Sequence, residues 1–132
     1  MLPAPMTTIV EGVSSVTVHV RDLQKSRNFY RDVLGLREIA FQEDRGRLVF
    51  ALPGIPTVLA MHVQGPGEGG REPGTVTGVV FTSSDVGAAC AEFRRRGGTV
   101  TMDPVTVPGW GITRAVIADP DGNEFVLATP TP

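Results

Sequence analysis

Cysteine is nearly absent from this chain: Cys90 is the single one among 132 residues. One thiol permits no internal disulfide and no multi-cysteine zinc or iron–sulfur site. The length favours one domain, or two very small motifs that share a core, and a chain of this size buries about two-thirds of its unfolded surface without cross-links. We therefore expect a fold held by packing alone, with Cys90 as a buried, unreactive thiol.

Concentrated positive charge and long apolar runs are also missing. The net charge is −2, and the longest basic cluster, Arg94–Arg96, has three residues, whereas nucleic acids and anionic membranes need a concentrated basic surface. No apolar run approaches the ~20 residues that cross a bilayer. The first six residues do not resemble a signal peptide. We therefore expect a cytoplasmic protein without nucleic-acid or membrane partners, and the arginine-rich, lysine-poor composition is typical of GC-rich bacterial genes.

What the chain does contain is a segment in which apolar and polar residues alternate, followed by a segment in which apolar residues recur at helical spacing. Val16, Val18 and Val20 alternate with more polar residues, which predicts a strand with one apolar face. Asp22 is a favourable helix N-cap, apolar residues then recur at helical spacing, and Gly35 is a favourable helix end. Three further strands are expected after this helix, at 37–42, 47–52 and 57–63.

The same pattern returns after a glycine- and proline-rich segment at 65–74, which we interpret as a linker. A strand at 76–82, a cap at Asp85 and a helix that ends at Gly97-Gly98 repeat the first unit at a shift of 63 residues. Three strands are again expected, at 100–102, 112–118 and 124–129. The predicted fold class is α+β: loose N-terminal residues 1–10, then two tandem βαβββ units at 11–64 and 75–129 whose curved mixed sheets enclose a cleft.

The repeat also predicts where a site belongs. Each sheet is expected to pack its valine-rich face against its own helix, so the opposite face must be covered by the other unit or by a partner chain. Two curved sheets that face each other enclose a cleft, and the side chains on those inner faces are the candidates for binding or chemistry.

Two stretches resemble the signature sequences of a known family. They are HVRDLQKSRNFYRDVLGL at 19–36 and DPDGNEFVL at 119–127. They are similar to those of the glyoxalase/bleomycin-resistance/extradiol-dioxygenase group, the vicinal-oxygen-chelate superfamily. The resemblance covers residues 12–128 and implies the two-unit fold. Members of this superfamily differ in chemistry, so the fold alone does not determine an activity.

The resemblance also implies where a metal would be held. Metal-dependent members carry His, Gln or Glu at four inward strand positions around one divalent ion. Those positions correspond here to Ser15, Ala60, Gly78 and Val126. Glycine, alanine and valine have no side-chain donor, and a serine hydroxyl is a poor lone ligand. We therefore expect no metal at this locus and no cofactor.

Two histidines are candidates for the cleft. His19 shares a strand face with Ser15, and His62 shares one with Ala60. His19 can act as a hydrogen-bond partner or general base for a ligand, or it is a partly solvated residue at the rim. If the two strands are neighbours, the rings lie within roughly 7 Å, which leaves open a relocated two-histidine metal site. Glu124 is the only nearby carboxylate candidate, although its position beside a turn favours a solvated residue.

Trp110 and Arg114 form a second candidate group, since alternation along the predicted strand puts them on the same face as Ile112 and Val116. A tryptophan offers a stacking surface for a planar ligand, and an arginine beside it pairs with a carboxylate or carbonyl group. Antibiotic-binding members of the resembled family commonly carry Trp-Gly in this loop. The alternative is a tryptophan at the barrel edge and an arginine in a surface ion pair. The full predicted ligand-binding set is His19, Val58, His62, Val80, Trp110, Ile112, Arg114 and Val116, with no catalytic residue assigned.

These residues favour a metal-free small-molecule-binding protein, similar to the bleomycin-resistance type, that sequesters an aromatic or polar amphipathic compound such as an antibiotic or another natural product. The alternative is a glyoxalase-like lyase, isomerase or dioxygenase with displaced metal ligands or metal-free acid–base chemistry. A third hypothesis is a module that binds another protein through the cleft. The resemblance to members of the binding type implies a homodimer in which the N-terminal unit of one chain faces the C-terminal unit of the other. We therefore expect a homodimer.

Overall fold

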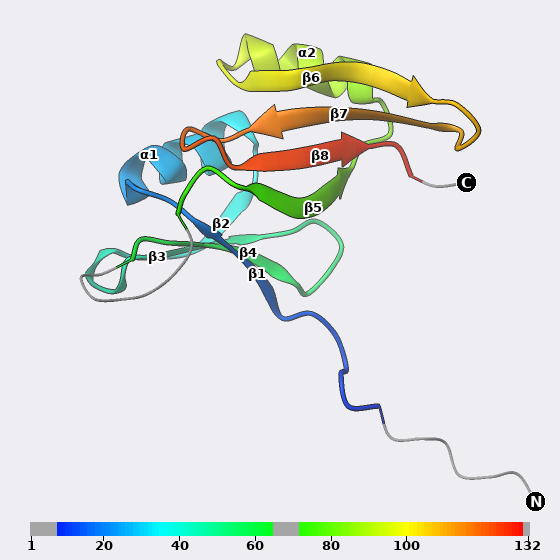
Figure 1. Cartoon of the computed structure of the whole chain (residues 1–132). Helices are drawn as coiled ribbons and strands as arrows, with labels where there is room; N and C mark the ends of the chain where they lie inside the picture. The colour runs from blue at the N-terminus through cyan, green and yellow to red at the C-terminus, as the bar shows by residue number, and fades with distance from the viewer. Residues whose placement is uncertain (1–7, 65–71, 131–132) are drawn as a thin grey trace, which may run out of the picture.

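The computed structural model describes residues 8–64 and 72–130. They form two units, each with a mixed four-stranded sheet and a helix on one of its faces (Figure 1). Most of the predicted linker at 65–74 lies outside the described residues. No helix of the described ranges is both long and apolar enough to cross a bilayer.

The first unit follows the expected order. Its strands lie side by side as β1-β4-β3-β2, with β1 parallel to β4 and the other pairs antiparallel. This topology arises because the helix returns the chain in the original direction and each hairpin then reverses it. The elements are β1 (Ser15–His19), α1 (Leu23–Asn28), a π-helical turn (Phe29–Val33), β2 (Arg37–Gln42), a 3₁₀ turn (Glu43–Arg45), β3 (Arg47–Ala51) and β4 (Val58–His62).

The second unit repeats this topology, with strand order β5-β8-β7-β6, so the predicted α+β class with two tandem βαβββ units is confirmed. One strand is longer than expected, because β6 continues through Pro104 instead of ending at Met102. Proline removes a ladder donor, but β6 is an edge strand whose register shifts between Met102 and Val105, where proline is tolerated. The elements are β5 (Val76–Thr82), α2 (Val86–Arg95), β6 (Thr99–Val107), β7 (Ile112–Ala118) and β8 (Glu124–Ala128).

Equivalent aspartates start the two helices. Asp22 Oδ1 accepts a hydrogen bond from the backbone nitrogen of Lys25 at 3.0 Å, and Asp85 Oδ1 accepts one from that of Ala88 at 2.9 Å. Each cap satisfies a helix donor that would otherwise lack a partner and contributes about 1 kcal/mol. The internal repeat is therefore present in hydrogen-bonding geometry as well as in sequence.

The first helix differs from the uninterrupted α-helix expected up to Gly35. Its last turn is π-helical, with the backbone nitrogen of Leu34 donating to Phe29 O at 2.9 Å. Two consecutive aromatic residues are buried in this turn, Phe29 at 8% and Tyr30 at 0% exposure. The prediction was right about the helix, and the spacing of its apolar residues did not indicate the π-helical hydrogen bonding of its last turn.

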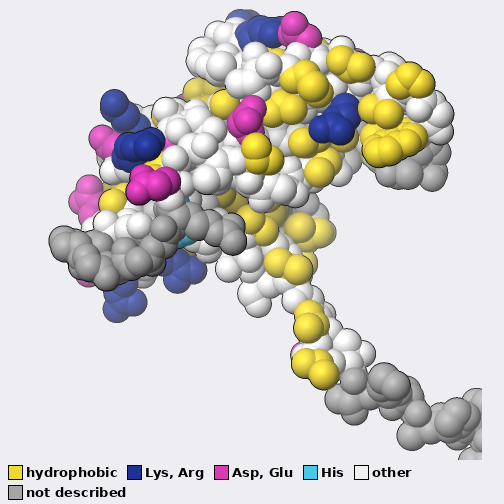
Figure 2. Space-filling view, in the orientation of Figure 1, with side chains coloured by type: hydrophobic (Ala, Val, Ile, Leu, Met, Phe, Trp, Pro, Cys, Tyr) yellow, Lys and Arg dark blue, Asp and Glu magenta, His cyan; other side chains and the backbone are white. Residues whose placement is uncertain are grey.

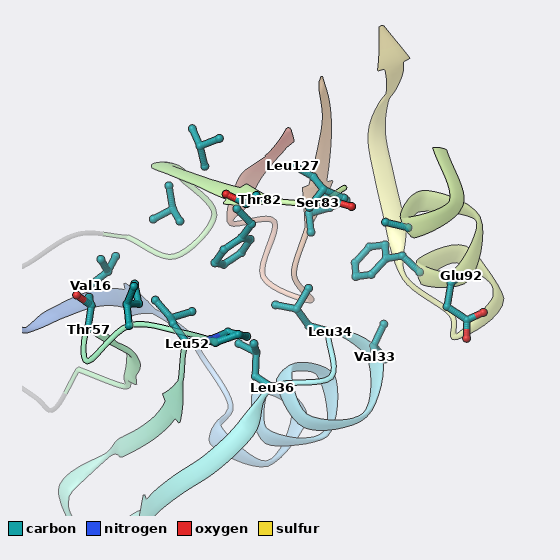
Figure 3. A pocket seen from close by; sticks show the side chains of 18 of the residues that line it. Val16, Val33, Leu34, Leu36, Leu52, Thr57, Thr82, Ser83, Glu92 and Leu127 are labelled. Atoms are coloured by element: carbon teal, nitrogen blue, oxygen red, sulfur yellow. The ribbon is translucent and has the colours of Figure 1, made fainter. Parts of the chain in front are cut away.

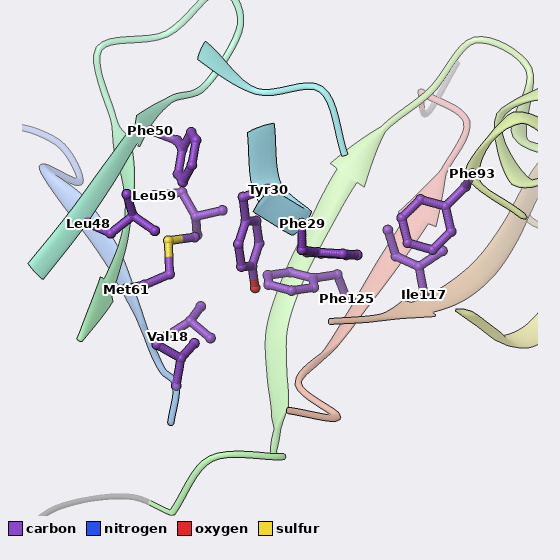
Figure 4. Close-up of a cluster of buried hydrophobic side chains, with 11 residues drawn as sticks. Val18, Phe29, Tyr30, Leu48, Phe50, Leu59, Met61, Phe93, Ile117 and Phe125 are labelled. Carbon is purple, nitrogen blue, oxygen red and sulfur yellow. The ribbon is translucent and has the colours of Figure 1, made fainter. Parts of the chain in front are cut away.

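This turn lies in a core that both units share (Figure 4). The Tyr30 ring is 5.9 Å from that of Phe50 in β3 and 6.2 Å from that of Phe125 in β8, while Phe29 is 5.8 Å from Phe93 in α2. The strand residues of this core are those that face the helices. The opposite face of each sheet takes no part in it, and we call that side the open face.

Two glycine substitutions test the packing at opposite ends of α2. A Cβ on Gly98 would overlap the buried Phe93 ring, whereas a Cβ on Gly87 would make only ordinary contact with Asp85. Gly98→Ala is expected to lower the free energy of unfolding by about 2–3 kcal/mol through overpacking. Gly87→Ala is expected to raise it by about 0.5–1 kcal/mol through helix propensity. Urea denaturation measures both, and equal effects would contradict this packing.

Candidate functional site

The open face of the first sheet carries the two predicted histidines. His19 of β1 lies opposite His62 of β4, and the two ring centroids are 6.1 Å apart, in agreement with the separation expected from the sequence. His19 Nδ1 is buried and has no hydrogen-bond partner. This nitrogen can accept or donate a hydrogen bond according to its tautomer.

The histidine pair does not extend into a metal site among the described residues. No group of three or more His, Cys, Asp or Glu side chains that could hold a metal ion occurs in the ranges 8–64 and 72–130. Glu124 instead accepts a hydrogen bond from Thr101 Oγ1 at 2.8 Å, within the second sheet. Protein zinc sites use three or four protein ligands, so the described residues do not complete a site around His19 and His62.

The open face of the second sheet is mainly apolar. Val80, Val126 and Val116 lie side by side on β5, β8 and β7, and Val80 is 60% exposed. Arg114 lies on the same face, opposite Ala128 of β8. Hydrophobic side chains are spread over this unit in Figure 2. Such a surface offers apolar contact with one strong cationic group.

A hollow of about 180 Å³ opens on this face. It brings together the predicted binding residues Arg114 and Val116 with Gly78 and Val126, two of the positions at which the resemblance places metal ligands. Arg114 Nε is buried and has no hydrogen-bond partner. The residues that line the hollow are Val76, Gly78, Val79, Arg114, Val116, Glu124, Phe125 and Val126.

The four positions that would hold a metal do not fit one. Ser15 and Ala60 lie on strands β1 and β4, and Gly78 and Val126 lie on β5 and β8. Together these side chains supply one hydroxyl oxygen. Gly78 also has a φ of +78°, a left-handed conformation that disfavours any side chain. At Gly78, therefore, neither the backbone conformation nor the side chain suits a metal ligand. No metal-dependent step can be built on these four residues.

Trp110 lies outside the strand on which alternation placed it. β7 begins at Ile112, and Trp110 is 65% exposed in the preceding turn. Its neighbours Gly109 and Gly111 have φ angles of +80° and +68°, so the chain is not extended there and alternation does not apply. Trp110 lines neither the hollow nor the groove described next.

A larger groove of about 730 Å³ lies between the two units on their helix side (Figure 3). Val80 is the one predicted binding residue that lines this helix-side groove. The groove was not predictable from strand alternation, because its walls come from helix ends and loops as well as from the helix-facing sides of strands. The apolar residues around Gly35 are the signal that could have indicated it. Its apolar lining includes Val16, Val33, Leu34, Leu36, Leu52, Ile55, Val79, Phe81, Phe93 and Leu127.

The charged residues of the helix-side groove already bind each other. Arg96 Nε donates to Glu92 Oε1 at 3.1 Å, and Arg95 Nε donates to Glu92 Oε2 at 2.6 Å. Hydrogen bonds from Arg95 and then Arg96 lower the pKa of Glu92 to about 2. Arg96 also donates to the backbone oxygen of Val33 at 3.3 Å. These groups are therefore engaged with protein partners and offer little to a ligand.

The turn at 119–123 joins the units beside the first histidine. Asp119 Oδ2 accepts hydrogen bonds from Tyr30 OH at 2.7 Å and from Asn123 Nδ2 at 2.9 Å, and Asn123 Nδ2 also donates to His19 O at 2.9 Å. Burial, and then the nearby Asp119 carboxylate, raise the pKa of Tyr30 well above its ordinary value. The phenol thus stays protonated and donates. This network fixes the end of β1, where His19 lies, against the second unit.

Comparison with known proteins agrees with the fold and the two motifs. The model of the Glyoxalase/Bleomycin resistance protein/Dioxygenase superfamily matches residues 12–127. The chain belongs to this superfamily. It is 34% identical over 116 residues to a lactoylglutathione lyase of Escherichia coli O157:H7, a match that spans 83% of this chain and 86% of that protein.

Solved structures are also similar to this chain. A member from Sphaerobacter thermophilus has 31% sequence identity and a TM-score of 0.82, with 93% of this chain and 100% of that chain covered. TnmS3, an antibiotic-binding protein from a Streptomyces species, has 29% identity and a TM-score of 0.78, with 95% and 100% covered. The proteins similar to this chain thus include a lyase and an antibiotic-binding protein, and superfamily membership does not choose between these functions.

The structure divides the predicted binding residues between two surfaces. His19, Val58 and His62 lie on β1 and β4, at the open face of the first sheet. On the open face of the second sheet lie Val80, Ile112, Arg114 and Val116. Neither the hollow nor the helix-side groove is lined by members of both groups.

Proposed function

We propose that this protein binds a small molecule without a metal ion, as a superfamily member similar to the bleomycin-resistance type. The observation that carries the proposal is the set of side chains at Ser15, Ala60, Gly78 and Val126, which offers a metal one hydroxyl oxygen. An apolar surface with a few unpaired polar groups suits an aromatic or polar amphipathic compound. The similarity to an antibiotic-binding protein supports this choice, and we propose an antibiotic or another natural product as the ligand.

The proposed ligand lies over the open faces rather than in the helix-side groove. The open faces carry buried ring and guanidinium nitrogens without partners, on His19 and Arg114, whereas Glu92 and Arg96 of the groove bind each other. Orientation by hydrogen bonds from a few polar groups, with apolar contact around them, is the usual arrangement of a ligand site. Trp110, exposed at its hairpin tip, stacks on a ligand that extends beyond the strands.

The site is completed by a second copy of the chain in this proposal. Val76, Val80 and Val105 on the second sheet are 75%, 60% and 51% exposed, an apolar surface that a partner's open face would cover. Packed open face to open face, two chains would bring His19 and His62 of one protomer opposite Arg114 of the other. All predicted binding groups would then line one cleft.

The dimer is tested by light scattering coupled to size exclusion. At micromolar concentration the expected mass is twice the 14.0 kDa of the chain. Val80→Glu should shift the protein toward monomer, because it places a charge in the covered apolar surface. Asp44→Ala on the exposed 3₁₀ turn should not. A wild-type monomer at micromolar concentration would contradict the dimer.

A lyase is the second candidate function, and the His19–His62 pair together with the lactoylglutathione lyase relatives favours it. In a metal-free form, His19 would act as a general base through its unpaired Nδ1. An assay of lactoylglutathione lyase activity with and without added divalent metal separates the candidates. We expect no turnover above the uncatalysed rate.

The direct test of the binding proposal is a screen of planar aromatic compounds by native mass spectrometry and equilibrium dialysis. We expect at least one compound to bind at one molecule per chain and to be recovered chemically unchanged. Conversion of a bound compound to product by substoichiometric protein would favour the enzyme instead. Failure of the whole panel to bind would contradict the proposal.

A further inference from the structure

We infer that the ligand carries an acidic oxygen, such as a carboxylate, which Arg114 binds at the hollow of the second sheet. This inference rests on the proposed function and names the class of its ligand: an apolar or aromatic compound with an anionic group. Three features of Arg114 support it: its apolar surroundings, its lack of a counter-ion among the described residues, and the size of the hollow.

The surroundings of Arg114 are apolar on both neighbouring strands. Across the ladders it lies opposite Ala128 of β8 and Val105 of β6, and Val116 and Val126 line the same hollow. The guanidinium is partly buried and its Nε is fully buried without a hydrogen-bond partner. A buried polar atom in a folded protein usually has a partner, so a partner is missing from this position.

No protein carboxylate forms an ion pair with Arg114 within the described ranges. Arg27, another partly buried arginine, has a two-point bond to Glu38 at 2.6 and 3.1 Å. Glu124 lines the same hollow but accepts its hydrogen bond from Thr101. An unpaired, partly buried cation destabilises the free protein, and an anionic ligand would relieve that cost.

The hollow is too small for a whole ligand. Its volume of about 180 Å³ is below the roughly 300 Å³ at which pockets for drug-sized ligands begin. It therefore takes one end of the ligand, and the planar guanidinium favours a group with two oxygens in one plane. The remainder of the ligand extends over the exposed valines of the open face.

The test compares two probes that differ in one group, 2-naphthoate and the neutral 2-naphthamide, by isothermal titration calorimetry. Wild-type protein is expected to bind the carboxylate at least about tenfold more tightly, as for a desolvated charge pair. Arg114→Gln should reduce this preference to less than about twofold. Arg45→Gln, at an exposed arginine of the 3₁₀ turn, should retain the wild-type preference.

The outcomes separate this inference from the proposed function. Equal affinity for both probes, or a carboxylate preference that survives in Arg114→Gln, would overturn the role of Arg114 and leave a binding protein for neutral compounds. Binding of neither probe at millimolar concentration would overturn the inference, while the proposed function would still be judged on its own screen.

A ligand-free measurement gives a second readout. Arg114→Met keeps most of the side-chain volume and removes the unpaired charge, so it should raise the Tm of the free protein by a few degrees. A Tm lowered by this change would mean that the guanidinium has a stabilising protein partner, which would contradict the inference.

Discussion

Asn123→Ala is expected to lower the free energy of unfolding by roughly 3–5 kcal/mol. The Asn123 side chain is 1% exposed and makes four hydrogen bonds. Its Oδ1 accepts from the backbone nitrogens of Gly74 and Thr75 at 2.9 and 3.1 Å, and its Nδ2 donates to His19 O and Asp119 Oδ2, both at 2.9 Å. Alanine would leave all four partners without this amide, in surroundings that are buried at Asp119 and part-buried at the other three.

The expected loss is a large fraction of the 5–15 kcal/mol that stabilises a typical domain. Urea denaturation followed by circular dichroism measures it. Asn28→Ala is the matched control, because the Asn28 amide is exposed and binds only the nearby side chains of Gln24 and Arg31. The control should change stability by less than about 0.5 kcal/mol. A loss below about 1 kcal/mol for Asn123→Ala would show that the two units do not depend on this amide.

Val126→Trp is expected to weaken binding of both naphthyl probes by about 100-fold or more, or about 2.8 kcal/mol. Val126 lines the hollow on the second sheet, and an indole there would occupy the volume that the ligand needs. Tryptophan is well accommodated in strands, and this side chain points away from the helix-facing core. The Tm should therefore change by only a few degrees, so that lost binding is not caused by unfolding.

The control places the same indole in the other cavity. Ala89 is half-buried and lines the helix-side groove, so Ala89→Trp places an indole in that groove and leaves the open faces unchanged. It should bind the probes within about twofold of wild type. The reverse result, in which Ala89→Trp abolishes binding and Val126→Trp does not, would move the ligand site to the helix side.

Features set by short-range patterns were predictable from the sequence. Alternation gave the bounds of Arg37–Gln42 and Ile112–Ala118 as the structure has them, and the caps at Asp22 and Asp85 are present. The proximity of His19 and His62 was also predictable. Alternation puts both residues on the same face of the sheet, and the parallel pairing of their strands brings them to the same level.

Features that depend on distant parts of the chain were not predictable. The bond from Asn123 to His19 spans 104 residues, and nothing local indicates which carbonyl a turn amide will reach. The π-helical burial of Phe29 and Tyr30 depends on rings of the second unit. The exposure of Trp110 follows from the left-handed glycines beside it, a conformation that a strand pattern does not reveal.

A lyase and an antibiotic-binding protein are both similar to this chain, so in the proposed function the side chains on the scaffold determine the chemistry. The scaffold here carries Ser15 and Ala60 on the first sheet and Gly78 and Val126 on the second, at the positions where the resemblance places metal ligands. It replaces donor atoms with a hydroxyl, a methyl group, a hydrogen atom and an isopropyl group. In the proposed function, the replacement at Gly78 and Val126 leaves a hollow that takes part of a ligand instead of an ion.

The metal content of the protein tests this central claim most directly. Protein purified without chelators should contain less than about 0.1 equivalent of zinc, nickel, iron, manganese or cobalt per chain by elemental analysis, and excess metal should raise its Tm by no more than about 1 °C, because an ion that does not bind the native state cannot stabilise it. One equivalent of a divalent metal per chain, with a matching increase in Tm, would contradict the account.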